Sequence, residues 1–215
     1  MRAAEYDAWY DTDRGRWIGE TEYQLLSELL TPQFGEHVLD VGCGTGWFTR
    51  RIAALAGVEV TGIDIDSEAL AFAREHDLRS RYREADACRL PFADNSFHKV
   101  MSVTALCFVA DWSQALAEIV RVTSDRFVVG VLNRHSLLWL EKGRDGGTGA
   151  YRGAHWHTHR ELRQALADLP VCDLDIRTAV LLPSASLLAR QTEQCLSRRL
   201  PFGSFLVVAG RKNSQ

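Results

Sequence analysis

The sequence predicts an α/β fold in which helices wind around a mostly parallel β-sheet. Short apolar runs alternate with amphipathic segments along the 215 residues, and the first clear apolar run ends in a glycine-rich turn. The length fits one domain spanning residues 1–215. The hydrophobic fraction of 46% and the charged fraction of 25% are ordinary for a globular protein, which excludes disordered, collagen-like and coiled-coil classes.

The first half of the chain alternates between helical and extended patterns. Four leucines within residues 25–30 share one helical face, and the Thr-Pro pair at 31–32 ends that helix. β-branched residues alternate over 58–63 and indicate a strand, and Asp66 or Ser67 can cap the helix that follows. The remaining elements expected here are strands over 37–41 and 82–85 and a helix over 48–55.

The second half continues the alternation to the end of the sheet. Asp111 with Gln114 forms a capping-box pattern for one helix, and Thr158 with Glu161 forms a second. Residues 142–153 interrupt the pattern because five of these twelve residues are glycine, which predicts a mobile loop. The other expected elements are strands over 97–103, 127–132, 171–182 and 205–209 and a helix over 186–199.

The strongest functional signal is VLDVGCGTG at residues 38–46. An apolar strand carries Asp40 near its end, and glycine recurs at Gly42, Gly44 and Gly46. This turn is a ligand-binding position in doubly wound sheets, because glycine lets a ligand approach the backbone closely. The third glycine of the usual dinucleotide motif would stand one residue later, where this chain has Trp47.

An acid beside the glycine turn favours a cationic ligand. A pyrophosphate binds free N–H groups at a helix N-terminus, and Asp40 would repel it. S-adenosylmethionine (SAM) carries an α-ammonium group, a sulfonium and no phosphate. The motif, which includes Cys43, resembles motif I of the class I SAM-dependent methyltransferases, and similarity to that family extends over residues 36–133.

The resemblance implies roles for residues that follow the other strands. Asp64 would accept hydrogen bonds from the ribose diol, and Ile65 would lie against the adenine. Asp86 would accept a hydrogen bond from the adenine amino group, and the Ala87 N–H would meet a ring nitrogen. Thr104 would line the methionine end. The implied cofactor-binding set is therefore Asp40, Gly42, Cys43, Gly44, Gly46, Asp64, Ile65, Asp86, Ala87 and Thr104.

The family also implies an architecture and a reaction. Its fold is a Rossmann-like, doubly wound sheet of seven strands, mostly parallel with the last strand antiparallel. SAM would lie across the carboxyl ends of the first, second and fourth strands, and S-adenosylhomocysteine would be the product. Methyl transfer from a sulfonium is an in-line displacement on an activated carbon, so the enzyme mainly positions the acceptor and excludes water.

Several acceptor classes are excluded. With 25 basic and 28 acidic residues the net charge is −3, which favours neither nucleic acid nor an anionic membrane as a partner. The Pro-Cys dipeptide of cytosine-C5 methyltransferases is absent. Residues 103–106 read Val-Thr-Ala-Leu rather than the Asp/Asn-Pro-Pro-Tyr/Phe of enzymes that methylate exocyclic or amide nitrogens. The remaining resemblance is to small-molecule methyltransferases of the quinone-biosynthesis type.

Two segments are expected to cover the acceptor. Residues 1–30 would form an N-terminal helical lid, and residues 134–157 would form a substrate-cover insertion. The sequence YDAWY places Tyr6, Trp9 and Tyr10 in the first segment as an aromatic wall. These aromatic residues serve equally well as a staple over the core, and the glycine-rich loop of the second segment reads equally as a tolerated surface insertion.

Candidate catalytic residues lie in the same two segments. They are Tyr10, His135 in LNRHSLLW, and His155 and His157 in AHWHTH. A histidine with a pKa of ~6.5 is a suitable general base for a phenol or acid. The alternative for each histidine is a solvated loop position. We expect no metal site, because Thr158 acting as a helix cap would separate the rings.

The remaining expectations concern location and assembly. Five cysteines without a C-x-x-C pattern and an N-terminal segment without an apolar signal region predict a reducing, cytoplasmic environment. We expect a monomer or homodimer. Two other functions stay open: an NAD(P)-dependent oxidoreductase and a non-catalytic SAM-binding regulatory subunit.

Overall fold

The computed structural model describes residues 2–196 and 198–213. In this part of the chain seven strands form one sheet with the order β3-β2-β1-β4-β5-β7-β6. Strand β7 pairs antiparallel with β5 and β6, and the other pairs are parallel. This confirms the predicted sheet. The strands are β1 (His37–Val41), β2 (Glu59–Asp64), β3 (Arg81–Glu84), β4 (Phe97–Val103), β5 (Thr123–Leu132), β6 (Val171–Ala179) and β7 (Phe205–Lys212).

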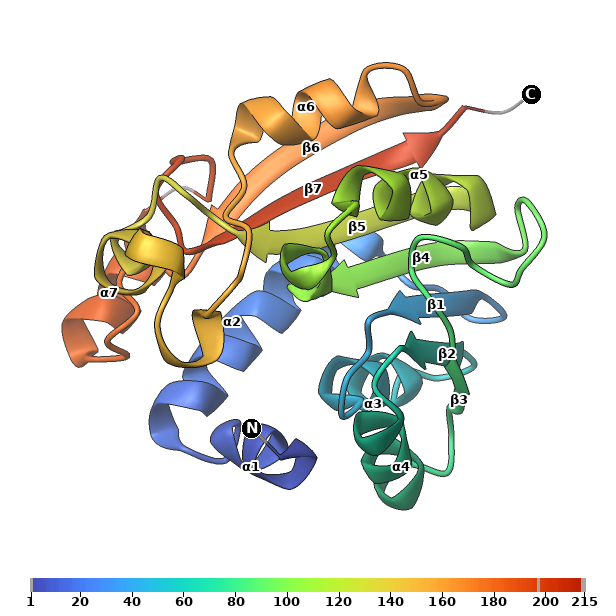
Figure 1. The fold of residues 1–215 in the computed structure, drawn as a ribbon, viewed down its shortest axis with the longest axis horizontal. Coiled ribbons are helices and arrows are strands. Elements are labelled where there is room, and N and C mark those ends of the chain that lie inside the picture. The colour runs from blue at the N-terminus through green and yellow to red at the C-terminus, as the bar shows by residue number, and fades with distance from the viewer. Residues whose placement is uncertain (1, 197, 214–215) are drawn as a thin grey trace.

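Helices cover both faces of the sheet (Figure 1). Helices α2 and α3 pack on one face, and α5 and α6 pack on the other. Val128 and Val129, neighbours on β5, belong to the opposite cores, so this central strand is buried on both sides. The helices are α1 (Ala3–Trp9), α2 (Asp13–Leu30), α3 (Trp47–Ala53), α4 (Ser67–His76), α5 (Trp112–Val122), α6 (His159–Leu166) and α7 (Leu187–Cys195).

The predicted helix caps are mostly present. Asp66 caps α4, and the capping box over residues 158–161 opens α6. Asp111 caps α5 by accepting a hydrogen bond of 3.1 Å from the Gln114 N–H. The Gln114 side chain instead donates to the Cys88 carbonyl at 3.4 Å, so the predicted capping box at this helix is wrong in its second half.

Several element boundaries differ from the prediction. Strand β5 begins at Thr123, four residues early, because its polar start pairs with Phe97 at the start of β4. Strand β6 ends at Ala179. The helix expected over 186–199 is the shorter α7, and Ser197 of that range lies outside the described residues.

The glycine-rich segment, predicted as a mobile loop, folds into short hydrogen-bonded turns. It contains the short helical turns Trp139–Gly143, Arg144–Gly146 and Gly149–Tyr151. The Gly153 N–H donates to the Gly146 carbonyl at 2.9 Å, which closes the segment on itself. Glycine supplies the positive φ angles that these consecutive turns need.

Both expected cover segments lie at one end of the sheet. In Figure 1 the arrowheads of β1, β4 and β5 point toward the side where α1 and the gold segment after β5 are found. The carboxyl ends of the parallel strands and these two segments therefore share one edge of the molecule. Within the described residues, no helix has the length and apolar character needed to cross a membrane.

Candidate active site

A cavity of about 930 Å³ opens at the carboxyl edge of the sheet. Its walls come from the ends of β1, β2 and β4, from α1, and from residues 149–150 of the gold segment. All of the predicted cofactor residues except Gly46 line it. The residues predicted from separate motifs therefore lie together at one cavity.

The glycine turn after β1 forms the floor of the cavity. Gly42 has a φ of +74°, and a Cβ there would overlap the Cβ of Ala105. Gly46 has a φ of +79° and precedes α3, where a Cβ would lie 2.5 Å from the Tyr82 hydroxyl oxygen. No atom lies within 4 Å of a Cβ placed on Gly44. Gly42 and Gly46 thus allow the close packing of this turn, and Gly44 leaves open space.

Asp64 ends β2 and ties the glycine turn to the next loop. Its Oδ2 accepts a hydrogen bond of 2.7 Å from the Gly44 N–H, and its Oδ1 accepts one of 2.9 Å from the Asp66 N–H. A carboxylate oxygen has two lone pairs, so each oxygen can accept a further hydrogen bond from a ligand hydroxyl. Asp86, after β3, is exposed and accepts a hydrogen bond of 2.8 Å from the Cys88 N–H.

Asp40 differs from the other acids because it is almost completely buried, with 1% of its surface exposed. Its Oδ2 accepts a hydrogen bond of 2.6 Å from the Thr49 hydroxyl. Burial raises the pKa of Asp40 to about 7, and the Thr49 hydrogen bond opposes this effect. A cationic group in the cavity would stabilise the charged form of this carboxyl.

Large apolar side chains stand at the cavity wall. Ile65 is 72% exposed and Phe108 is 55% exposed, and both line the cavity. These exposed side chains offer apolar surface that a flat ligand in the cavity can cover. Ile65 was predicted from the resemblance, whereas no pattern in the sequence marked Phe108.

The aromatic residues of the N-terminal segment form one side of the cavity. The Tyr10 ring stacks on Trp47 with centroids 4.2 Å apart, and its hydroxyl lies 3.3 Å from that of Tyr6. Tyr6 and Tyr10 line the cavity, while Trp9 contacts Tyr10 from outside the lining. Burial raises the phenol pKa of Tyr10 well above its usual value, so this hydroxyl remains protonated.

The three candidate histidines lie elsewhere. His157 is fully buried, both of its ring nitrogens lack a hydrogen-bond partner, and burial lowers its pKa to about 4. His155 stacks on Trp112, and His135 is exposed. None of them lines the cavity. Backbone hydrogen bonds from His157 to Leu132 and from His155 to Cys107 hold this stretch along the sheet. Their positions do not favour the predicted role of general base.

Charge distinguishes this cavity from its surroundings. Every charged residue in its lining is an aspartate. Two of these aspartates, Asp66 and Asp111, lie at helix N-termini and were predicted only as helix caps. The full set is Asp40, Asp64, Asp66, Asp86 and Asp111. None of these five forms an ion pair in the described part of the chain. Within residues 2–196 and 198–213, no three His, Cys, Asp or Glu side chains meet in a metal-binding group.

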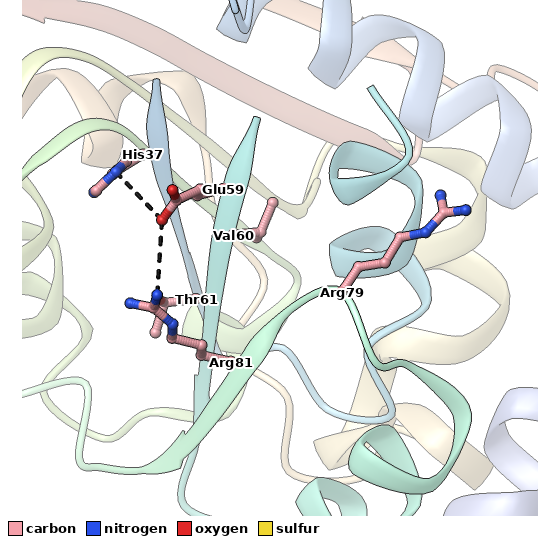
Figure 2. A pocket seen from close by; sticks show the side chains of 6 residues that line it. All are labelled: His37, Glu59, Val60, Thr61, Arg79 and Arg81. Atoms are coloured by element: carbon pink, nitrogen blue, oxygen red, sulfur yellow. Dashed lines mark ion pairs between the residues drawn. The ribbon is translucent and has the colours of Figure 1, made fainter. Parts of the chain in front are cut away.

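A second, smaller cavity of about 110 Å³ lies at the opposite, amino end of the strands. Figure 2 shows Glu59 between His37 and Arg81, with Arg79 directed away from this group. The Glu59 carboxylate lies 3.4 Å from the His37 Nε2 and 3.9 Å from an Arg81 nitrogen. The Glu59 carboxylate is therefore paired within the protein.

Comparison with known proteins gives relatives over much of the chain. Residues 39–126 match a family described as Methyltransferase domain. An uncharacterized protein of Mycobacterium tuberculosis is 37% identical over 172 residues, which cover 77% of this chain and 57% of that protein. A malonyl-[acyl-carrier protein] O-methyltransferase of Erwinia billingiae is 40% identical over 99 residues, covering 46% of this chain and 39% of that enzyme. The chain thus spans well under two thirds of these relatives.

Solved structures share the whole fold at lower identity. A SAM-dependent methyltransferase of Thermotoga maritima, described as a possible histamine N-methyltransferase, aligns with a TM-score of 0.77 and 24% identity, covering 98% of this chain and 95% of that one. A geranyl diphosphate C-methyltransferase of Streptomyces coelicolor aligns with a TM-score of 0.67 and 19% identity, covering 89% and 78%. The fold is the one that the sequence predicted.

Proposed function

We propose that this chain, which matches a family described as Methyltransferase domain over residues 39–126 and shares the fold of a SAM-dependent methyltransferase, transfers a methyl group from SAM to a small-molecule acceptor. The observation that carries the proposal is the cavity at the carboxyl edge, where the glycine turn and three strand-end acids meet an aromatic wall. Its volume of about 930 Å³ is large enough for a nucleoside and a small acceptor together.

The residues present fit SAM better than a dinucleotide. The close packing at Gly42 leaves no room for a side chain, so the turn offers bare backbone to a ligand. The lining offers carboxylates for an ammonium group, a ribose diol and an adenine amino group, and it offers no basic side chain for a pyrophosphate. These features support the methyltransferase over the NAD(P)-dependent oxidoreductase.

Each acid has a distinct role in the proposal. Asp40 holds the ammonium group, Asp64 accepts hydrogen bonds from the ribose hydroxyls, and Asp86 with the Ala87 N–H reads the adenine edge. Ile65 covers the adenine face. When bound, SAM supplies a methyl group on a positively charged sulfur, which in-line displacement can transfer.

The chain's other residues position the acceptor. Thr104, at a φ of +58° after β4, lies at the end proposed for the methionine part. The Tyr10 hydroxyl, which stays protonated, can donate a hydrogen bond to an acceptor. The lid of residues 1–30 and the cover of residues 134–157 would exclude water, since Ala3 of the first segment and Ala150 of the second both line the cavity.

Calorimetric titration with S-adenosylhomocysteine, repeated with NADH, tests the cofactor. We expect micromolar binding of S-adenosylhomocysteine and none of NADH. Tighter binding of NADH would contradict the proposal and support the oxidoreductase. A second assay follows S-adenosylhomocysteine release from SAM against a metabolite panel. Binding without release across a broad panel would instead indicate the SAM-binding regulatory subunit.

A further inference from the structure

Helix α1 covers the cavity but is weakly anchored to the rest of the fold. Ala3 and Tyr6 of this helix line the cavity, and none of its seven residues is buried. Within residues 2–196 and 198–213, one hydrogen bond joins α1 to an element that follows α2, and it runs from Arg50 to Asp7. A segment with few buried residues and few hydrogen bonds opens at low free-energy cost. We therefore expect the closed position of α1 to depend strongly on this bond.

Arg50 lies on α3 and contacts α1 and the glycine turn at the same time. Its Nη2 donates a hydrogen bond of 2.9 Å to the Asp7 Oδ1, and its Nη1 donates one of 2.6 Å to the Thr45 carbonyl. The side chains of Arg50 and Asp7 are only 23% and 20% exposed, so solvent screens this ion pair less than it screens an exposed pair. The planar guanidinium group holds both partners in a fixed geometry. Arg50 thus connects the lid to the turn.

Thr45 gives this connection an end that faces the ligand. It stands between Gly44 and Gly46 in the glycine turn, lines the cavity and is 2% exposed. Its hydroxyl has no hydrogen-bond partner among the described residues. A buried hydroxyl without a partner destabilises a fold. A ligand in the cavity that hydrogen-bonds to this hydroxyl therefore gains affinity and holds Thr45 in place.

We infer that Arg50 is a positioning residue that couples cofactor binding in the glycine turn to closure of α1. A cofactor group that hydrogen-bonds to the Thr45 hydroxyl fixes the Thr45 carbonyl, and this carbonyl holds the guanidinium group where it binds Asp7. Because such coupling is reciprocal, closure of α1 also stabilises the bound cofactor. Closure brings Tyr6 to the cavity wall, so the acceptor meets a complete wall after the cofactor has bound. This inference rests on the proposed methyltransferase function.

Arg190 on α7 provides a matched control. Its side chain also binds an aspartate and a backbone carbonyl, with hydrogen bonds of 2.8 Å to both carboxylate oxygens of Asp13 and of 3.0 Å to the Ala185 carbonyl. This ion pair joins α7 to the start of α2, and none of the three residues lines the cavity. Arg190→Ala therefore removes the same kind of contact away from the lid.

The release rate of S-adenosylhomocysteine tests the Arg50–Asp7 pair, and stopped-flow displacement followed by tryptophan fluorescence measures it. We expect release to be at least about tenfold faster in Arg50→Ala and within about twofold of wild type in Arg190→Ala. Asp7→Ala leaves α3 unchanged, should also speed release, and repeats the test should Arg50→Ala fail to fold. The double variant should be little faster than Arg50→Ala, because both changes remove one contact. Arg50→Lys should be intermediate, since lysine lacks the planar fork.

Two outcomes of this experiment would overturn the inference. One is an equal release rate in wild type, Arg50→Ala and Asp7→Ala. The other is equally fast release in Arg190→Ala, which would show that any lost ion pair loosens the fold enough to free the ligand.

Hydrogen exchange in α1 separates closure of the helix from overall stability. We expect S-adenosylhomocysteine to slow exchange of the α1 amides in wild type and Arg190→Ala but not in Arg50→Ala. Thr45→Val keeps the shape of the side chain without its hydroxyl and should also lose this slowing. Equal slowing in wild type and Arg50→Ala, or no slowing in wild type that binds the ligand, would contradict the coupling. Failure of wild type to bind S-adenosylhomocysteine would disprove the proposed function, and this inference with it.

Discussion

Charged residues at the amino end of the parallel strands have partners within the protein, whereas the acids that line the cavity at the carboxyl end lack a partner of opposite charge among the described residues. At the amino end, Glu59 lies between His37 and Arg81 (Figure 2), and Lys99, which is 3% exposed, pairs with Asp125 at 2.5 Å. At the carboxyl end, the acids of the large cavity have no basic partner in the described chain. Strand β2 carries both situations, with Glu59 at one end and Asp64 at the other.

This difference indicates which end is prepared for a ligand. Paired charges at the amino end are satisfied within the protein, so a ligand would have to displace an existing partner. Unpaired acids at the carboxyl end gain their partner only when a cationic or hydroxyl-rich molecule binds. Matched variants at the two ends that change S-adenosylhomocysteine affinity equally would contradict this interpretation.

The largest difference is expected between two glycines with positive φ. Gly42→Ala adds a Cβ that overlaps Ala105 at the cavity floor, whereas Gly35→Ala, before β1, adds one with no atom within 4 Å. Overpacking costs about 1–3 kcal/mol, and we expect Gly42→Ala to weaken S-adenosylhomocysteine binding by roughly a hundredfold. Gly35→Ala should lower the melting temperature slightly and leave binding intact. Equal binding losses in the two variants, measured by calorimetry, would show that strain alone controls the cavity.

The next largest difference is expected between Asp64 and Glu59, the acids at the two ends of β2. Asp64→Ala removes the acceptor proposed for the ribose diol and also the hydrogen bond to the Gly44 N–H. We expect a loss of about 1–3 kcal/mol in the free energy of S-adenosylhomocysteine binding. Glu59→Ala removes an equally charged side chain at the other end of the strand and should change that free energy by less than about 0.3 kcal/mol. Unchanged binding in Asp64→Ala would remove Asp64 from the proposed site.

Local patterns predicted most of the fold and the floor of the site. The strands over residues 37–41 and 97–103 match β1 and β4, because apolar alternation and the neighbouring turn residues specify them within a few positions. The glycine turn was identified from its local pattern, and the acids after the strands were identified from the family resemblance. Parallel strands then bring their carboxyl ends together, so separate short motifs became one cavity.

Features that depend on packing between distant segments were not predicted. His157 looked available in the sequence, yet a hydrogen bond from its N–H to the Leu132 carbonyl places it against the sheet. The Gln114 side chain finds a carbonyl contributed by another loop. Such contacts depend on the tertiary structure and have no signature in neighbouring residues.

The pH dependence of S-adenosylhomocysteine affinity tests the role of Asp40 at the carboxyl end. Its folded pKa of about 7 lies above the unfolded value of ~3.9, so between these values the folded state binds more protons and its stability falls as pH rises. A bound ammonium group requires the charged carboxylate. We therefore expect affinity for S-adenosylhomocysteine to increase from about pH 6 to about pH 8, with proton release on binding. Asp40→Asn should flatten this profile. An identical pH profile in wild type and Asp40→Asn, measured by calorimetry, would exclude Asp40 as the ammonium partner.

The smallest effect is expected from Arg81→Ala at the amino end. The Arg81 side chain is 83% exposed and lies 3.9 Å from Glu59, so solvent screens the pair and it contributes about 0–0.5 kcal/mol to stability. Urea unfolding should detect little change, and S-adenosylhomocysteine affinity should stay within about twofold of wild type. Because Arg81 begins β3, the strand that leads to Asp86, a larger change in affinity would mean that the charges at one end of the strands influence the other. The unpaired acids would then no longer suffice to identify the binding end.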